Sequence, residues 1–310
     1  MVGVDEDVRI DVVKRRSKSS INGVWYSFAR AGWVGVFLLL AVGAAAQNLF
    51  VSDADGGNIY EITPEGVEST FASGLSYPMA LTFNSAGNLF VVENGVDIKE
   101  FTADGKETTF ASGLYGITGL ACDGAGNLFV AASLAPVPGG GIFKYTPSGT
   151  RTIFASGLYG PEGLAFNSEG NLFEADTGLE GDVYEFTPAG VQSTFASGLY
   201  SATELAFDSA GDLFVLDFYG SKIYKFTPNG VGSVFVSGLF EPAGLAINSD
   251  DDLFVTDGDG IIEITPNGTQ SLFTSTPGIH LAFQPVPEPS GLALLAVGTA
   301  TLVVCRRRHA

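Results

Sequence analysis

The chain has 310 residues, of which 45% are hydrophobic and 16% are charged, and its formal net charge is −19. This hydrophobic content suffices for a packed core and excludes wholesale disorder. Most of the negative charge lies in residues 47–290, where six Lys or Arg stand against thirty Asp or Glu. A region with this excess of negative charge repels phosphate backbones, which excludes nucleic acid as a partner.

The first 46 residues have the layout of a signal peptide. A basic stretch, KRRSKSS, precedes the apolar run AGWVGVFLLLAVGAAAQ, which ends in Ala44-Ala45-Ala46. This order of basic region, apolar run and small residues is typical of an export signal, here cleaved before Gln47. An uncleaved membrane anchor remains the alternative, although the apolar run is short for a span.

A unit of about forty residues then recurs through residues 47–285. It is marked by a leucine in the motif Asn/Asp-Leu-Phe, which returns after 40, 39, 44, 41 and 40 residues, at Leu49, Leu89, Leu128, Leu172, Leu213 and Leu253. Such a period with strand-like content indicates a propeller blade or a solenoid turn. Each unit has four short apolar runs separated by turn signals such as NSEG and TPAG, which predict a four-stranded meander.

The runs are apolar at consecutive positions, which indicates strands covered on both faces and favours a propeller. The first unit starts at its second strand, and the last ends on an extra HLAF, His280–Phe283. We therefore predict an all-β, six-bladed β-propeller of four-stranded antiparallel blades over residues 47–285. A C-terminal strand should complete the first blade and close the ring, with hydrophobic helices flanking the propeller at both ends.

The phrase GLAFNSEGNLFEADT, followed by GDVYEFTPAG, resembles the NHL-repeat and gluconolactonase-like six-bladed propellers over residues 47–285. In gluconolactonase-like enzymes this resemblance implies a divalent cation at the mouth of the central channel, held by Glu, Asn and Asp side chains. Glu162 in PEG is similar to the motif that supplies the Glu, but the inner strands offer no matching Asn. Virginiamycin B lyase, a similar propeller, uses catalytic histidines, and since residues 47–285 contain only His280, lyase activity is not expected.

Candidate site residues are those that break the repeat at the start of the predicted innermost strands. Glu162, Glu204 and His280 stand where other units have small or neutral residues. They are candidates for general acid–base work, and Glu162 and Glu204 also for metal ligation, against the alternative of solvated rim residues. Asp257 and Asp259, near the run Asp250–Asp252, are candidates for binding Ca²⁺ or another divalent cation.

Two further series recur once per unit. Acids follow the second strand at Asp53, Glu93, Asp176, Asp217 and Asp257. We predict that they cap backbone N–H groups of the adjoining loop. Aromatic residues follow the motif Ser-Gly-Leu at Tyr115, Tyr159, Tyr200 and Phe240. We predict that they pack between blades, the alternative being a surface that stacks on sugars.

The last 25 residues read VPEPSGLALLAVGTATLVVCRRRHA. Pro287-Glu288-Pro289, an apolar stretch and a terminal Arg cluster in this order resemble the PEP-CTERM sorting signal of exported bacterial proteins. The resemblance implies that an exosortase-type transpeptidase processes residues 286–310. A simple C-terminal membrane anchor is the alternative, with the arginines held on the cytoplasmic side.

The sequence as a whole favours an exported propeller sorted to the bacterial cell envelope or released outside the cell. Its expected function is that of a non-enzymatic binding module for exopolysaccharide or an envelope protein. The alternative is a metal-dependent lactonase, similar to gluconolactonase, with its site at the channel mouth.

Overall fold

A computed structural model of the chain describes residues 47–133, 139–178 and 181–286. These residues form strands and turns, and they contain no helix long and apolar enough to cross a membrane. The predicted signal peptide (1–46), the sorting segment after Val286 and the hydrophobic helices expected in both lie outside the described residues.

The strands are grouped into six antiparallel sheets of four. The first three blades, each from its inner to its outer strand, are β24 (His280–Phe283), β1 (Leu49–Asp53), β2 (Asn58–Ile62), β3 (Glu68–Ser73); β4 (Pro78–Phe83), β5 (Leu89–Glu93), β6 (Asp97–Phe101), β7 (Glu107–Ala111); and β8 (Ile117–Cys122), β9 (Leu128–Ala132), β10 (Gly141–Tyr145), β11 (Arg151–Ser156). The other three are β12 (Pro161–Phe166), β13 (Leu172–Asp176), β14 (Asp182–Phe186), β15 (Gln192–Ala196); β16 (Ala202–Phe207), β17 (Leu213–Asp217), β18 (Lys222–Phe226), β19 (Gly232–Ser237); and β20 (Leu245–Ile247), β21 (Leu253–Asp257), β22 (Gly260–Ile264), β23 (Gln270–Thr274).

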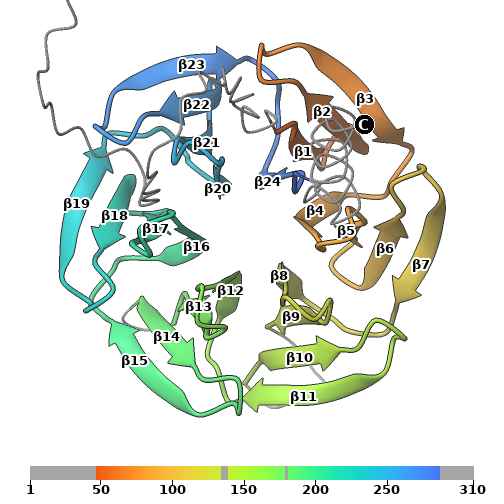
Figure 1. Cartoon of the computed structure of the whole chain (residues 1–310), viewed down its shortest axis with the longest axis horizontal. Coiled ribbons are helices and arrows are strands. Elements are labelled where there is room, and N and C mark those ends of the chain that lie inside the picture. Colours follow the sequence, from red (N-terminus) through yellow and green to blue (C-terminus); the bar gives the residue numbers. More distant parts are fainter. Residues whose placement is uncertain (1–46, 134–138, 179–180, 287–310) are drawn as a thin grey trace, which may run out of the picture. The chain divides into compact units, whose positions relative to one another are not determined.

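The six sheets are arranged as the blades of a propeller, with the predicted Leu-Ala-Phe strands β24, β4, β8, β12, β16 and β20 nearest the centre (Figure 1). The fourth strands lie at the rim (Figure 1). The prediction of an all-β, six-bladed propeller of four-stranded antiparallel blades is confirmed. In the first blade β24 pairs with β1, with His280 opposite Ser52 and Phe283 opposite Leu49.

The turns follow from their residue types. In the turn after β12, Asn167 Oδ1 accepts hydrogen bonds from the N–H groups of Glu169 (3.0 Å) and Asn171 (2.9 Å). Gly170 then takes a φ of 82°, which a side chain would disfavour. The sixth blade uses Asp251 at the equivalent position, with a φ of 64°, and its carboxylate accepts hydrogen bonds from the N–H and hydroxyl of Ser209 in the fifth blade.

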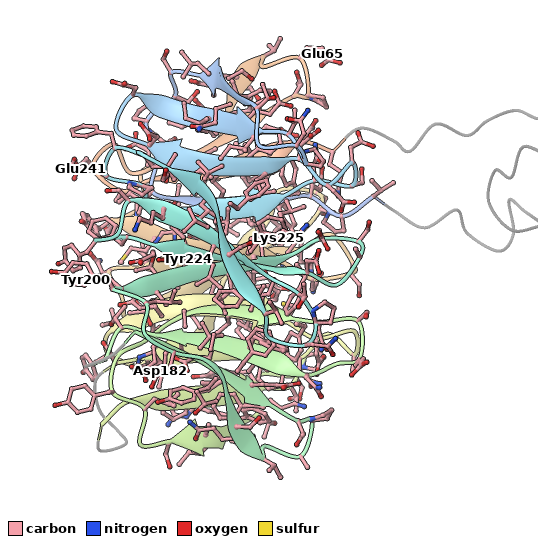
Figure 2. All side chains as sticks on the ribbon, turned by 90° about the vertical axis from the view of Figure 1, so that its left-hand side faces the viewer. Glu65, Asp182, Tyr200, Tyr224, Lys225 and Glu241 are labelled. Carbon is pink, nitrogen blue, oxygen red and sulfur yellow. The ribbon has the colours of Figure 1, made fainter. Side chains whose placement is uncertain are left out.

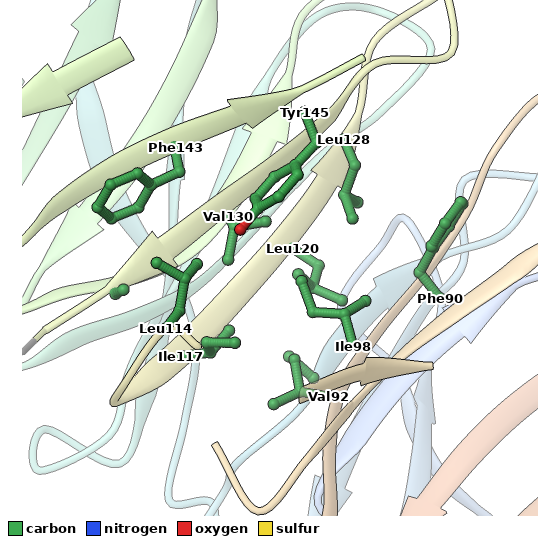
Figure 3. Close-up of a cluster of buried hydrophobic side chains, with 12 residues drawn as sticks. Phe90, Val92, Ile98, Leu114, Ile117, Leu120, Leu128, Val130, Phe143 and Tyr145 are labelled. Atoms are coloured by element: carbon green, nitrogen blue, oxygen red, sulfur yellow. The ribbon is translucent and has the colours of Figure 1, made fainter. Parts of the chain in front are cut away.

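Apolar side chains fill the space between neighbouring blades. Figure 3 shows the cluster between the second and third blades, where Val92 and Ile98 of one blade meet Leu120 and Val130 of the next. Phenylalanines recur in these clusters in edge-to-face contact: the ring of Phe50 lies 4.9 Å from that of Phe83 in the next blade. The repeated Leu-Phe and Leu-Ala-Phe motifs are thus residues that make each blade cover its neighbours.

Candidate functional site

The ring has two faces with different loops. We call the end at which the inner strands begin the crown face, and the opposite end the turn face. Because the strands alternate in direction, the crown face carries the loops between second and third strands and the loops that enter each new blade. Tyr200 and Glu241, from blade-entering loops, project from one side in Figure 2, and Glu65, from a turn between third and fourth strands, lies on the other.

The recurrent acids at the ends of the second strands bind backbone N–H groups on the crown face. Asp176 accepts hydrogen bonds from the N–H groups of Tyr159 (2.8 Å), Gly160 (3.0 Å) and Gly178 (2.7 Å). Asp217 binds its own two loops in the same way. The predicted capping role is confirmed, with the addition that Asp176 and Asp217 each tie two loops together, the one that enters the blade and the one that follows the second strand. Asp53 binds an N–H group of the following loop, and Glu93 binds one of the entering loop.

Glu162, Glu204 and His280, the three residues that break the repeat, come together at the crown end of the inner strands. Glu162 is the second residue of β12, Glu204 the third of β16, and His280 the first of β24. Glu204 Oε1 lies 2.9 Å from His280 Nδ1, and both side chains are less than one-fifth exposed. This contact joins the fifth and first blades across the sixth.

Glycines make room for this contact. Neighbouring inner strands approach so closely that a Cβ on Gly163 would lie 2.5 Å from the Thr203 carbonyl oxygen, and one on Gly244 would collide with the Ile279 carbonyl. The same Cβ on Gly163 would also lie 3.1 Å from Glu204 Oε2. The Glu204 carboxylate therefore rests between β12 on one side and β24 on the other.

Burial and neighbouring charge shift the pKa of Glu162. Desolvation is the main cause and Glu204 adds to it, while His280 opposes the shift, and the pKa of Glu162 rises from 4.5 to about 7. A carboxyl group with this pKa exchanges its proton near neutral pH, as a general acid or base requires. Glu204 is held by His280 as a hydrogen-bonded partner.

Glu174 is a fourth carboxyl that the sequence analysis missed. It lies in β13 where the other five units have valine, at Val51, Val91, Val130, Val215 and Val255. Its exposed fraction is 0%, and among the described residues neither carboxyl oxygen has a hydrogen-bond partner. Burial, reinforced by Asp176 and Glu162, raises its pKa well above the usual value, with the nearby backbone of Glu162 opposing the shift. The fold therefore favours the protonated form of Glu174 over the ionised form.

The cation implied by the gluconolactonase-like resemblance does not fit these residues. Within the described part of the chain, no group of three or more His, Cys, Asp or Glu side chains is arranged to hold a metal ion. Asp257 accepts hydrogen bonds from the N–H groups of Phe240 (2.8 Å) and Asp259 (3.4 Å). The run Asp250–Asp252 precedes β21, whereas Asp257 and Asp259 stand at its other end, on the crown face. Cation binding by Asp257 and Asp259 stays a prediction.

The aromatic series contradicts the prediction that it packs between blades. The side chains project from the crown face and are largely exposed: Tyr115 57%, Tyr159 74%, Tyr200 74% and Phe240 60%. Tyr77 (48%) and Tyr219 (69%) add to them, and the rings of Tyr200 and Tyr219 lie 5.8 Å apart, edge to face. Phenylalanines of the strands already fill the space between blades, so the loop aromatics remain outside it. We call these six residues the aromatic crown.

Hollows between blades occur away from these residues. One of about 220 Å³ opens between the fourth and fifth blades on the turn face, lined by Ser168, Gly211 and Pro228 among others. Such hollows repeat where neighbouring blades diverge and carry none of the residues that break the repeat. We therefore regard the crown face as the candidate site.

No protein-family model matches the sequence, and no curated protein matches it. Solved structures do match. A nidogen/laminin complex aligns over 78% of this chain and 99% of that chain, with a TM-score of 0.69 and 17% identity. A gluconolactonase from Xanthomonas campestris aligns over 69% and 80%, with a TM-score of 0.60 and 17% identity.

Virginiamycin B lyase from Staphylococcus aureus aligns over 74% of this chain and 84% of that chain, with a TM-score of 0.56 and 17% identity. The three neighbours differ in function, so at this level of identity the similarity establishes the fold alone, and function must be argued from the site. The chain is a six-bladed β-propeller whose structural neighbours include gluconolactonase and lyase enzymes and a nidogen/laminin complex.

Proposed function

We propose that the protein is a non-enzymatic glycan-binding module that recognises exopolysaccharide through its crown face. The observation that carries this proposal is the aromatic crown: six aromatic side chains, each between 48% and 74% exposed, on one face of the ring. Exposed apolar groups gathered on one face indicate an interaction site. The flat rings of Tyr and Phe suit the apolar C–H faces of sugars and lose little entropy on binding.

The rigid loops support this function. Asp176 and Asp217 fix the backbone beside Tyr159 and Tyr200 with hydrogen bonds to their N–H groups. A preorganised surface loses less conformational entropy on binding than a mobile one. The aromatic side chains are therefore presented at fixed spacing, as recognition of a repeating polymer requires.

The proposal includes export and sorting to the envelope. The signal-peptide layout of residues 1–46 supports export, and the PEP-CTERM-like order of residues 286–310 supports processing by an exosortase-type transpeptidase. Pairing of β24 with β1 supports closure of the ring by the C-terminal strand. A closed propeller leaves only the short outer strand of each blade as a sheet edge, which limits aggregation of an extracellular protein.

A second candidate function is hydrolysis of a small lactone at the crown face. The pKa of about 7 at Glu162, beside the hydrogen-bonded pair of Glu204 and His280, favours it. Glu162 would act as a general base on water. Because the residues do not form a metal-binding group, we propose no metal-dependent step for it. Lactone hydrolysis that disappears in Glu162→Gln would establish this candidate in place of the first.

The binding function is tested by calorimetry of the purified full-length chain, in a detergent without a sugar headgroup, with soluble oligosaccharides of several chemical classes. We expect the double variant Tyr159→Ala/Tyr200→Ala to bind at least about tenfold more weakly, since each stacked ring contributes on the order of 0.5–1.5 kcal/mol beyond its buried area. The matched control is Val191→Ala/Val231→Ala, which removes two equally exposed side chains from the turn face. Equal affinities for both double variants would contradict a crown-face site.

A further inference from the structure

Basic side chains are almost absent from the crown face. Residues 47–286 contain six Lys or Arg. Lys144 and Lys225 form ion pairs with Asp123 and Asp208, which lie in turns of the turn face. Lys99 is in mid-strand between Glu93 and Glu107.

The other three Lys or Arg residues also lie mostly away from the crown face. Lys106 and Arg151 adjoin turns of the turn face, and only Lys222, the first residue of β18, stands at the crown end of a strand. Acids, by contrast, are plentiful there: Asp55, Glu241 and Asp259 are exposed in crown loops. The crown face thus presents negative charge around exposed aromatic rings.

We propose that the glycan bound at the crown face carries free amino groups, as in a de-N-acetylated hexosamine polymer, and that Glu204 with Glu162 receives one ammonium group at the centre of the ring. This inference rests on the proposed glycan-binding function and specifies its ligand. The Glu204 carboxylate has His280 of β24 on one side, at 2.9 Å, and Gly163 of β12 on the other. An ammonium group there would meet a carboxylate directly, and charge-assisted hydrogen bonds of this kind are stronger than neutral ones.

A second observation points to a positively charged ligand. Glu174 lies behind the start of β12, fully buried, with both carboxyl oxygens unpartnered among the described residues. Glu162, Asp176 and Asp182 are all close enough to Glu174 to raise its pKa, and no basic group lowers it. Neighbouring carboxyl groups thus disfavour ionisation at the inner end of the fourth blade. A cation beside the partly exposed Glu162 and Glu204 would relieve the repulsion between those two carboxylates.

Asp182 and Tyr184 belong to the same acidic side of the blade. Tyr184 donates its hydroxyl hydrogen to Asp182 Oδ2 (2.9 Å), and Asp182 Oδ1 remains buried and unpartnered within the described residues. A neutral sugar would leave the negative charge of these carboxylates uncompensated, whereas the ammonium group of an amino sugar would compensate it. The charge pattern thus distinguishes between two glycans that the aromatic rings alone would bind equally.

The test compares two hexamers that differ only in acetylation: glucosamine hexamer and N-acetylglucosamine hexamer. Calorimetry with the full-length chain should give about tenfold or greater preference for the free amine, the effect of one hydrogen-bonded charge pair. Glu204→Gln should remove most of that preference and leave affinity for the acetylated hexamer within about twofold. Glu65→Gln, which removes a carboxylate from the turn face, is the matched control and should change neither affinity.

The outcomes separate the two proposals. Binding of both hexamers with equal affinity would overturn the amino-sugar inference and leave glycan binding standing. Binding of neither hexamer, nor of any other oligosaccharide, would overturn both. If Glu204→Gln does not fold, Glu162→Gln provides the same comparison at the neighbouring carboxyl, with the thermal unfolding curve of each variant as the check on folding.

Discussion

The fourth and fifth blades have nearly the same sequence motifs and differ in the side chains at their inner ends. Both follow the motif FASGLY, both cap two crown loops with an acid, Asp176 or Asp217, and both pack a strand phenylalanine against the next blade. The fourth blade places Glu162 on its inner strand and Glu174 in its second strand, where the fifth has Thr203 and Val215. The shared residues account for the fold, and the departures carry the unusual electrostatics.

The substitution with the largest expected effect is in the second strand of the fourth blade, where it introduces the valine that the fifth blade has. Glu174→Val should stabilise the protein by about 3 kcal/mol at pH 7, because it replaces a buried, unpartnered carboxyl with the apolar residue that five other blades use. Thermal unfolding of the full-length chain measures it. The reverse substitution, Val215→Glu, should destabilise the fifth blade by a similar amount.

The stability gained in Glu174→Val should depend on pH for the same reason. The pKa of Glu174 is raised in the folded state, so above its unfolded value near 4.5 the folded protein retains a proton that the unfolded chain releases. The wild type therefore loses stability as pH rises, by about 1.4 kcal/mol per pH unit. The valine variant lacks this loss, and its advantage should grow as the pH rises above about 4.5. An advantage that stays constant with pH would mean that Glu174 is ionised and paired.

The next test removes the acid that the two blades share. Asp217→Ala should cost about 2 kcal/mol, because it leaves three backbone N–H groups without their charged acceptor. Asp176→Ala removes an equivalent cap but also removes a charge that opposes ionisation of Glu174 and Glu162, so it should cost less. Denaturant unfolding of both variants measures the difference, with exposed Asp55→Ala as the neutral control. Equal costs would indicate that the acids of the fourth blade do not interact.

The repeated residues made the architecture predictable, since each has a local reason to be where it is. Asn167 caps its own turn, Gly170 supplies a positive φ, and the leucine and phenylalanine of each Leu-Phe pair face opposite sides of a covered sheet. These requirements act within one unit or between adjacent units. They can be recognised from the pattern alone.

The site was only partly predictable, because it depends on residues far apart in the chain. Glu204 and His280 were recognisable as exceptions to the repeat, but their contact spans 76 residues and depends on the space left by Gly244 in the blade between them. Glu174 carried a signal that was missed, a charged residue at a position otherwise occupied by valine. The aromatic crown was misassigned because a recurring aromatic looks the same in sequence whether it fills an interface or projects from a loop.

The smallest of the three effects concerns the inner strands, where Glu162 of the fourth blade corresponds to Thr203 of the fifth. The pKa of Glu162 is about 7 in the folded state against 4.5 without the fold, so between these values the folded state alone keeps the proton, and stability falls as pH rises through this window. Glu162→Gln removes the titration. It should leave stability unchanged below about pH 4.5 and raise it by about 1–2 kcal/mol above pH 7, a figure reduced for partial solvent screening.

The matched control for this variant is Thr203→Val, whose effect on stability should not vary with pH. A stability gain for Glu162→Gln that disappears when Glu204→Gln is also present would assign the shift to repulsion between the two carboxylates. A gain that persists would assign it to burial, the larger of the two causes. Because an ammonium ligand favours ionised Glu162, binding of glucosamine hexamer should also release protons from the wild type and fewer from Glu162→Gln, measured as a buffer-dependent heat. This links the difference between the two blades to the ligand that the crown face selects.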